Sequence, residues 1–391
     1  MKNLPSRKIV LLITAVCFLA FFIFGFTDNL KGPTLPAMLA EMNISYGVGG
    51  NIFFGEYVGF LIASLITGIL ADRLGLKFVL LLAGFCLAIG VAGYSSLQSA
   101  GLLAGSLFVI GLGLGALELG PNAVIVSLHG ERKGLFLNLM AVLHGLGSMF
   151  APLFAGWLFA LNYSWRAMYR WDLLLIAFFI LLTFLLRFPK LEEKTRVDFN
   201  EIPRIAFGGL LPWFYVSIAA YVAVEIGIAS WLVIFLQEVR NASVLTSTRS
   251  LSTFFAMIML GRLLGGLVVQ RVGYLRSILS ASFGALLCIA IGLFIPATTA
   301  FFLPLTGLFL SIIFPTITAA VSDSKTENIN TLLGVLFTFA GLGAVIGPWL
   351  VGWGSDLFGL QAGFGINLLF AALTFISTWI LLKGTANGKT A

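Results

Sequence analysis

The chain has 391 residues, of which 59% are hydrophobic and only 10% are charged, and it contains 37 Phe and 44 Gly. This composition is far from that of a soluble globular domain and is typical of a polytopic membrane protein. The formal charge of +7 does not indicate a nucleic-acid partner, because the basic residues lie in short segments between apolar runs. Cys17, Cys86 and Cys288 lie in apolar runs without disulfide or metal-ligand spacing, so we expect no metal and no cofactor.

Lys2, Arg7 and Lys8 precede the first apolar run, as in a secretory signal, but no small-residue cleavage site follows, so we expect an uncleaved first helix. A membrane-spanning helix needs about 20 residues, and the polar punctuation of the chain indicates twelve such segments. The predicted spans are residues 9–36, 48–71, 77–97, 101–128, 134–160, 168–188, 209–237, 247–270, 275–296, 299–322, 329–354 and 361–383. The sequence therefore predicts an all-α membrane protein.

Twelve spans place both termini on one side of the membrane, and most of the Lys and Arg residues lie on that side. The positive-inside rule then predicts a multi-pass protein of the inner membrane with both termini in the cytoplasm. The longest polar interval, residues 189–208, lies midway along the chain. We expect residues 1–188 and 209–391 to form two six-helix bundles joined by this cytoplasmic linker, and we expect a monomer.

Two patterns recur in the two halves of the chain at nearly the same offset. The run Gly145–Trp157, with its Gly-Leu-Gly, Pro and Gly-Trp elements, recurs as Gly341–Trp353, 196 residues later. The glycines and the arginine of residues 68–75 recur in residues 266–273, 198 residues later. Two copies of a six-helix unit are typical of secondary transporters.

The loop after the second predicted span reads Gly68-Ile69-Leu70-Ala71-Asp72-Arg73-Leu74-Gly75-Leu76-Lys77. It resembles the Gly-x-x-x-Asp-Arg-x-Gly-x-basic signature of the major facilitator superfamily, which implies a fold of two pseudo-symmetric six-helix bundles. The glycines permit a tight turn, and Asp72 is placed to latch a neighbouring helix end or basic residue; the alternative is an ordinary solvated turn. Gln270 replaces the aspartate in the second copy, which predicts a weaker latch there. The candidate cytoplasmic gate residues are Gly68, Asp72, Arg73, Gly75, Lys77 and Arg271.

Residues 102–128 form an apolar span with a single carboxylate, Glu118, near its centre. A charge there costs about 2.5 to 3.5 kcal/mol on insertion scales, so Glu118 is expected to face protein or water rather than lipid. At helical spacing Glu118 shares one face with Gly111, Gly115 and Asn122. Glu118 is therefore the first candidate for a titratable transport residue, and the alternative is a buried carboxyl that forms a hydrogen bond inside the bundle.

Residues in six of the predicted spans form a further set. They are Phe24-Gly25-Phe26 to Pro36, Leu117-Glu118 with Asn122, Leu137-Asn138-Leu139, Tyr221 to Trp231, Gly261-Arg262 and Phe314-Pro315-Thr316-Ile317. As a set they resemble the fucose/galactose/glucose:proton symporter family over nearly the whole chain. The resemblance implies that Glu118 matches the family's proton-coupling glutamate. The family's helix-one acid falls on Gly32, one turn after Asp28, and its helix-five glutamine and a neighbouring amide fall on Ala141 and His144, which leaves the identity of the sugar open.

Four carboxylates, Asp28, Glu56, Glu118 and Glu225, lie within predicted spans. A membrane-buried carboxylate that faces an aqueous cavity can take up a proton on one side and release it on the other. Glu118, Asp28 and Glu225 are the proton-coupling candidates, although Glu225 also fits an acceptor that holds a broken helix together. Lys31 lies one turn from Asp28: if they pair, Asp28 is ionised and structural, and if not, Lys31 favours an anionic substrate. Glu56 lies two turns into its span, so we expect it at the hydrated rim of a cavity.

A neutral polyol is usually held by amide and carboxyl hydrogen bonds and by an aromatic face. The substrate-binding candidates are Asn29, Lys31, Asn122, Asn138, His144, Trp231 and Phe314, with Asn367 as a further amide. Each has a structural alternative, because a single Asn or His in a span often forms an inter-helix hydrogen bond and Trp231 also fits an interfacial anchor.

These inferences predict a secondary transporter, not an enzyme, that imports a hexose or deoxyhexose together with protons by alternating access. Its partners are the solute, protons and the lipid bilayer. The alternatives are a proton-driven exporter of a metabolite or drug and a carrier of an anionic sugar derivative. A membrane enzyme would need paired acids or metal ligands at a membrane surface, and the loops offer only His129 near Glu131.

Overall fold

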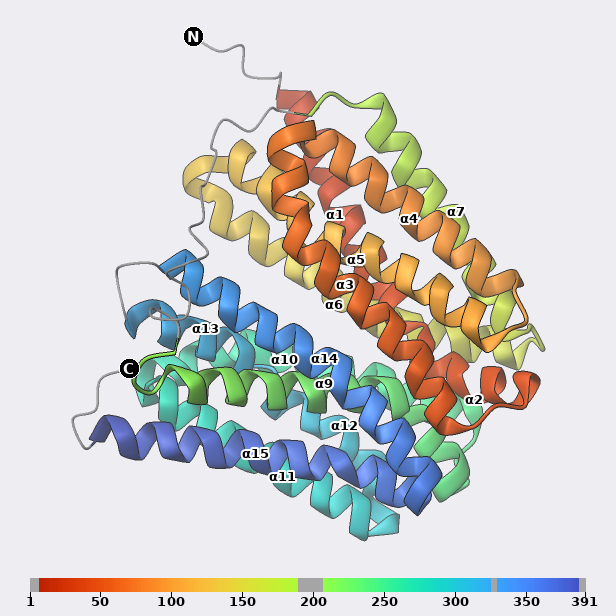
Figure 1. Cartoon of the computed structure of the whole chain (residues 1–391), viewed down its shortest axis with the longest axis vertical. Coiled ribbons are helices and arrows are strands. Elements are labelled where there is room, and N and C mark those ends of the chain that lie inside the picture. The colour runs from red at the N-terminus through yellow and green to blue at the C-terminus, as the bar shows by residue number, and fades with distance from the viewer. Residues whose placement is uncertain (1–6, 189–206, 325–328, 387–391) are drawn as a thin grey trace. The chain divides into compact units, whose positions relative to one another are not determined.

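The computed structural model describes residues 7–188, 207–324 and 329–386, so nearly all of the expected linker, 189–208, lies outside the described residues. Within these ranges all regular secondary structure is helical. The chain divides into two compact units, one of Met1–Ile44 and Asn51–Lys194 and the other of Ser45–Gly50 and Thr195–Ala391 (Figure 1).

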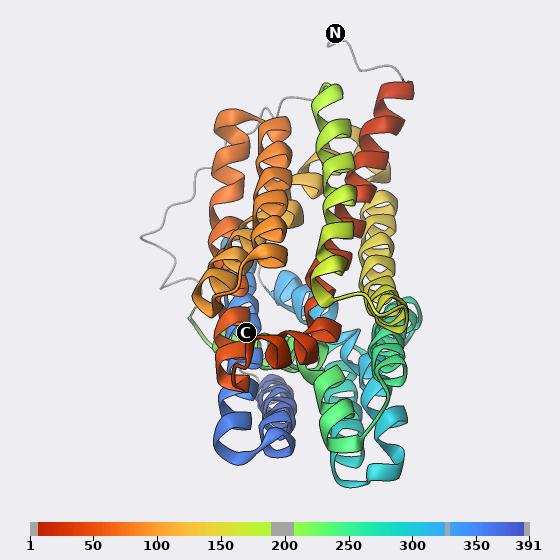
Figure 2. The same ribbon diagram turned by 90° about the vertical axis from the view of Figure 1, so that its right-hand side faces the viewer.

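In the first unit, α1 lies among α5, α6 and α7, and α4 lies beside α5 and α7 (Figure 1, Figure 2). The close packing places the C-terminal half of α1, almost all of which is buried, at the centre of the unit. The helices are α1 (Arg7–Asn29), α2 (Lys31–Met42), α3 (Tyr46–Leu74), α4 (Leu76–Ser96), α5 (Ala100–His129), η1 (Gly130–Arg132), α6 (Lys133–Ala160) and α7 (Trp165–Leu185).

In the second unit, α9 takes the central place and packs against α14 and α15, while α12 packs against α10 and α11. Its helices are α9 (Leu211–Arg240), α10 (Val244–Val272), α11 (Tyr274–Phe294), η3 (Pro296–Thr298), α12 (Thr299–Leu310), α13 (Ile313–Ser324), α14 (Ile329–Phe358) and α15 (Leu360–Ala386).

Two spans that were expected to be single helices are each broken once. Residues 9–36 fall into α1 and α2, which meet at Leu30, and residues 299–322 fall into α12 and α13. A proline removes one helical hydrogen bond and its ring crowds the carbonyl four residues earlier. For Pro33 that carbonyl belongs to Asn29, the last residue of α1, and for Pro315 it belongs to Ser311, directly after α12. Each break therefore lies where a proline removes a backbone hydrogen bond of the helix.

The internal repeat is also visible in the local geometry of the two units. A Cβ on Gly147 of α6 would overlap a backbone carbonyl of α1, and a Cβ on Gly343 of α14 would overlap a backbone carbonyl of α9. The turns after α3 and α10 contain Gly75 and Gly273, with φ of 87° and 86°. Left-handed φ values favour glycine. The repeated glycines thus have the same roles in each unit: one allows two helices to approach closely, and the other allows a tight turn.

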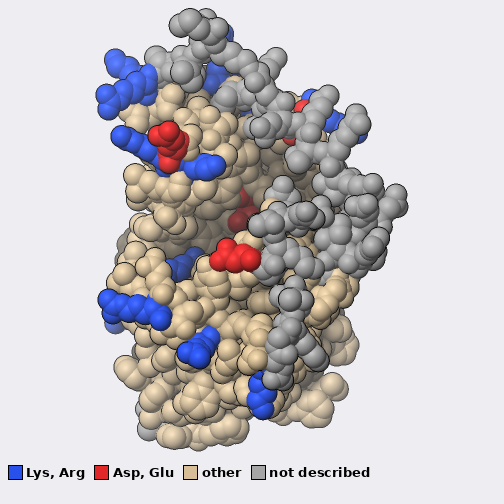
Figure 3. Space-filling view, turned by 90° about the vertical axis from the view of Figure 1, so that its left-hand side faces the viewer, with Lys and Arg blue, Asp and Glu red and all other residues tan. Residues whose placement is uncertain are grey.

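Large apolar side chains such as Ile89, Phe184 and Leu263 are exposed on the outer helices, and charged side chains are sparse on the face shown in Figure 3. Among the described residues, eleven helical stretches are long and apolar enough to cross a membrane. Twelve were expected, and the count differs because α5, η1 and α6 run on as one 61-residue stretch, Ala100–Ala160.

Candidate functional site

A cluster of three buried charges lies where α1 gives way to α2. Lys31, the first residue of α2, donates a hydrogen bond to Asp28 in the last turn of α1, and its Nζ lies 2.9 Å from Oε2 of Glu56 on α3. Lys31 is 4% exposed, Asp28 8% and Glu56 1%. We call these three residues the charge triad. When all three are ionised, two carboxylates share one ammonium and a single negative charge is left uncompensated.

Tyrosine side chains surround the triad. The Lys31 ammonium lies 4.3 Å from the centre of the Tyr57 ring, within the range of a cation–π contact. Tyr94 of α4 and Tyr169 of α7 are buried beside it, with ring centres 4.8 Å apart in an edge-to-face arrangement. The hydroxyl of Tyr169 lies 3.3 Å from that of Thr34 on α2. The ammonium is therefore enclosed by carboxylates and aromatic rings.

The triad bears on two expectations from the sequence. Asp28 pairs with Lys31, which was one of the two alternatives, and the enclosed ammonium argues against a free cation for an anionic substrate. The expectation that Glu56 lies at a hydrated rim is wrong. Glu56 is buried because α5 packs against α3 at this level, where a Cβ on Gly111 would overlap the Glu56 carbonyl.

Asn29 and His144 lie at the contact between α1 and α6. Asn29 Nδ2 donates to the Ser148 hydroxyl, 3.0 Å away, and to the Gly25 carbonyl, 2.9 Å away. The His144 ring meets Phe24 edge to face, with ring centres 4.7 Å apart. Both substrate-binding candidates therefore lie on the α1–α6 contact, and for Asn29 the structure shows the inter-helix hydrogen bond that was the structural alternative.

The predicted face of α5 exists, and its glycines pack on α3. Gly111 and Gly115 lie against backbone carbonyls of α3, and Glu118 follows on the same face and is half-buried. Asn122 is also half-buried and donates to the Glu118 carbonyl of its own helix, 2.6 Å away. Asn138, on α6, is exposed.

In the second unit, Glu225 belongs to a small polar group on one face of α9. Tyr221, one turn earlier, donates a hydrogen bond to Glu225, and Arg262 of α10 interacts with the same tyrosine. The Phe314 ring of α13 lies 6.4 Å from the Tyr221 ring. Trp231 is fully buried and donates to a backbone carbonyl of α14, 3.0 Å away, so the alternative of an interfacial anchor is wrong.

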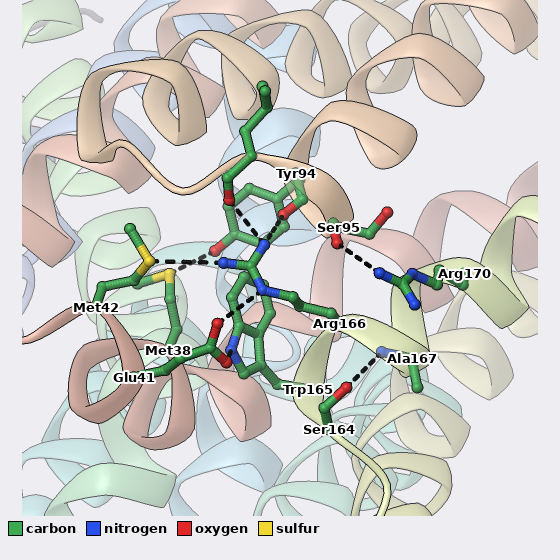
Figure 4. A network of polar contacts seen from close by, with 11 residues as sticks. Met38, Glu41, Met42, Tyr94, Ser95, Ser164, Trp165, Arg166, Ala167 and Arg170 are labelled. Carbon is green, nitrogen blue, oxygen red and sulfur yellow. Dashed lines mark hydrogen bonds and ion pairs between the residues drawn. The ribbon is translucent and has the colours of Figure 1, made fainter.

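A network at the α2 end of the first unit was missed at the level of the sequence. Figure 4 shows Arg166 of α7 between Glu41 of α2 and the end of α4. Its Nε donates to Glu41 Oε1 at 2.8 Å and its Nη1 to the Leu97 carbonyl at 2.7 Å, while Trp165 Nε1 donates to Glu41 Oε2 at 2.6 Å. The sequence feature that could have indicated this network is an acid, Glu41, near the end of one apolar run and an arginine, Arg166, near the start of another.

Asp172 is a fifth carboxylate within the spans, and it was also missed although it lies inside the predicted span 168–188. It is 1% exposed, and its Oδ2 accepts a hydrogen bond from the Thr27 hydroxyl of α1 at 2.8 Å. Its Oδ1 makes no hydrogen bond within the described part of the chain.

The gate candidates of the first unit lie at the turn between α3 and α4. Asp72 and Arg73 are exposed in the last turn of α3, and Gly75 has the left-handed φ that the turn requires. Lys77 donates to the Phe184 carbonyl near the end of α7, 2.6 Å away. Arg271 is exposed at the corresponding end of α10 in the second unit.

The chain is similar in sequence and in fold to known transporters. The family profile described as Major Facilitator Superfamily matches residues 17–325. A glucose/galactose transporter of Brucella abortus is 25% identical over 382 residues, which cover 91% of each chain. Among solved structures, a mutant of the nucleoside transporter NupG matches with a TM-score of 0.82 and 14% identity, covering 96% of this chain and 99% of the other. The fucose:proton symporter FucP in its outward conformation matches with a TM-score of 0.64 and 21% identity, covering 94% and 98%. These identities show the fold alone for the two structures, whereas the profile match covers most of the chain, which therefore belongs to the Major Facilitator Superfamily of membrane transporters.

Proposed function

We propose that this protein is a secondary active transporter that imports a hexose or deoxyhexose by proton symport with alternating access. The relative named as a glucose/galactose transporter, which aligns over 91% of this chain, supports the substrate class. Coupling of sugar transport to protons is supported by one observation: Glu118 is a half-buried carboxylate in the middle of the membrane-spanning helix α5.

A carboxylate in such a place can exchange a proton between the two sides. While ionised it resists transfer into a dry closed state, and once protonated it no longer does. The proton gradient then drives the step in which the substrate crosses. Glu225 is the further coupling candidate, whereas Asp28, which pairs with Lys31, fits the structural alternative; the enclosed Lys31 disfavours an anionic sugar derivative.

We propose substrate-binding groups in each unit, namely amide and imidazole groups in the first unit and an aromatic ring in the second. Asn29 and His144 on the α1–α6 contact and Phe314 beside Tyr221 are grouped with other polar side chains, which supports their assignment. Asn122, Asn138 and Trp231 complete the proposed set, whereas Lys31, which is paired with Asp28 and Glu56, is left out of it. Trp231 is fully buried, so its contribution is expected to be to the shape of the second unit rather than to direct contact.

The proposed topology has twelve crossings of an inner membrane, with both termini on its cytoplasmic side. The proposed working unit is a single chain. The stretch Ala100–Ala160 has 61 residues and would be about 90 Å long as a single helix, whereas the hydrocarbon core is about 30 Å thick. Gly130, with φ of 45°, interrupts it beside Arg132 and Lys133, which supports two crossings joined by a cytoplasmic turn. The gate residues Gly68, Asp72, Arg73, Gly75, Lys77 and Arg271 would then lie on the cytoplasmic side.

The test is uptake of labelled D-glucose, D-galactose and L-fucose by reconstituted liposomes, with and without an imposed pH gradient. We expect concentrative uptake of one of these sugars only with the gradient. Glu118→Gln should abolish gradient-driven accumulation but keep sugar counterflow, whereas the control Glu131→Gln, at an exposed glutamate in η1 directly after α5, should behave like the wild type. Unchanged accumulation by Glu118→Gln would remove Glu118 from the coupling role, and extrusion from inside-out vesicles would favour an exporter.

A further inference from the structure

We propose that the charge triad is an exchangeable proton site, in which Glu56 takes up one proton per transport cycle while Lys31 remains the fixed counter-ion of Asp28. The inference rests on the proposed function, since it adds a second carboxylate to Glu118 as a binding site for the coupling proton. It also explains why three charged side chains lie buried in a membrane-spanning unit, where charges are costly unless they are compensated.

The geometry separates the two carboxylates. Lys31 donates a hydrogen bond to Asp28, so this pair is well compensated. Its ammonium also forms an ion pair with Glu56, 2.9 Å from Oε2, and that oxygen is buried and receives no further hydrogen bond within the described part of the chain. A buried carboxylate oxygen without a hydrogen bond is destabilised relative to one in water. Lys31 is shared by both carboxylates but donates its hydrogen bond to Asp28, so we assign the remaining negative charge to Glu56, where one proton removes it.

Protonation converts the Glu56 carboxylate to a carboxylic acid and brings the net charge of the triad from −1 to zero, with no other bond formed or broken. Asp28 and Glu56 are close enough to interact directly. The hydroxyl of protonated Glu56 can therefore donate to the Asp28 carboxylate, as in other sites where two carboxyl groups share one proton. Because Lys31 already supplies one positive charge, the site needs one proton rather than two.

The other titratable groups around the triad are committed elsewhere or are neutral phenols. Tyr57, Tyr94 and Tyr169 face it from α3, α4 and α7. Arg166 of α7 is bonded to Glu41 and to carbonyls at the end of α4, and Asp172 of α7 accepts from Thr27. Among the described contacts, Lys31 is the cation that touches both carboxylates.

Glu118 lies on the same face of α5 as Gly111, the glycine that packs against Glu56 of the triad. Gly111 packs on the backbone of Glu56, and Glu118 follows seven residues later, which is about 10 Å along the axis of α5. Glu56 of α3 and Glu118 of α5 thus lie on two helices in close contact, and we infer that they provide two successive stations for a proton. Loss of the proton at either station is expected to uncouple transport.

The first experiment needs no transported substrate. Purified full-length protein is titrated from acid to alkaline pH and followed by infrared difference spectroscopy, which detects the carbonyl band of a protonated carboxyl group. We expect a carboxyl band that titrates near neutral pH, whose intensity falls in Glu56→Gln by the contribution of one carboxyl group and leaves that of Glu118; Glu131→Gln should leave it unchanged, because an exposed glutamate titrates at acid pH. A band that persists in Glu56→Gln with unchanged intensity would overturn the proposal, because the proton would then reside elsewhere.

The second experiment uses liposomes and labelled D-galactose or D-glucose. Glu56→Gln resembles the protonated state in size and charge, so we expect counterflow close to that of the wild type and loss of gradient-driven accumulation to the level without a gradient. Wild-type accumulation by Glu56→Gln, or accumulation that depends on Na⁺ without a pH gradient, would overturn the assignment. If the wild type itself accumulates no sugar, the proposed function fails, and the infrared titration still tests the triad.

Lys31→Met tests the fixed counter-ion. Without the ammonium, both Asp28 and Glu56 must be protonated to remain buried, so the carboxyl band near neutral pH is expected to rise by the contribution of one further carboxyl group. Folding is checked by size-exclusion chromatography. A folded Lys31→Met variant with a band equal to that of the wild type would contradict the role of Lys31, and the Glu56→Gln result stands independently if Lys31→Met does not fold.

Discussion

The Arg166 network makes a quantitative prediction, because Arg170 offers a control of the same type one turn along the same helix (Figure 4). In Arg166→Ala two short bonds are lost, at 2.8 Å to Glu41 and at 2.7 Å to the Leu97 carbonyl. Hydrogen bonds to charged groups contribute about 1.5 to 3 kcal/mol each. The Glu41 side chain is 44% exposed, so water replaces part of its interaction and its share is smaller. We expect a loss of about 2 to 3 kcal/mol in the free energy of unfolding.

Arg170 is exposed and makes one long bond, 3.5 Å, to the Ser95 carbonyl, so Arg170→Ala should change stability by less than about 0.5 kcal/mol. The assay is thermal unfolding in detergent, followed by circular dichroism at one scan rate. For a unit of this size about 1 kcal/mol corresponds to about 2 to 4 °C, so Arg166→Ala should unfold about 4 to 12 °C below the wild type. Equal unfolding temperatures for the two variants would refute the reasoning that this network holds α2 to α4 and α7.

Three further outcomes are expected. Gly147→Ala should lower the unfolding temperature because its Cβ overlaps α1, whereas Gly134→Ala, with open space around it, should raise stability by up to about 1 kcal/mol through helix propensity; equal shifts would contradict the close contact. Trp231→Ala should cost about 3 to 5 kcal/mol and reduce the yield of monodisperse protein, and a normal yield would show that Trp231 is not a core residue. Asp72→Asn, on an exposed side chain, should leave the unfolding temperature unchanged but slow sugar uptake, and an unchanged rate would argue for a simple solvated turn.

The helices were largely predictable from the chain alone. The span predicted at 77–97 corresponds to α4, Leu76–Ser96, and the one at 275–296 to α11, Tyr274–Phe294. Apolar runs of this length have few other stable structures in a bilayer, because each backbone polar group must be satisfied within its own helix. The turns at Gly75 and Gly273 were likewise visible as a repeat, since a left-handed φ favours glycine wherever the same turn recurs.

The candidate site was only partly predictable. The contact between Asp28 and Lys31 follows from their spacing of three residues on one helical face. Glu56 could not be assigned to the same cluster, since it lies 25 residues from Lys31 and its sequence position gives only its depth along α3. Asp172 and Arg166 were misjudged for the same reason, because their partners, Thr27 and Glu41, lie on other helices.

By itself the sequence determined that this chain is a bundle of membrane-spanning helices with an internal repeat, because burial of apolar surface and backbone hydrogen bonding act locally along each span. The tertiary structure alone decided which charges meet. The contact of Glu56 with Lys31 depends on how α3 is rotated about its axis and how closely Gly111 lets α5 approach it. That rotation and distance are set by side chains from several helices at once, so no single stretch of sequence contains them.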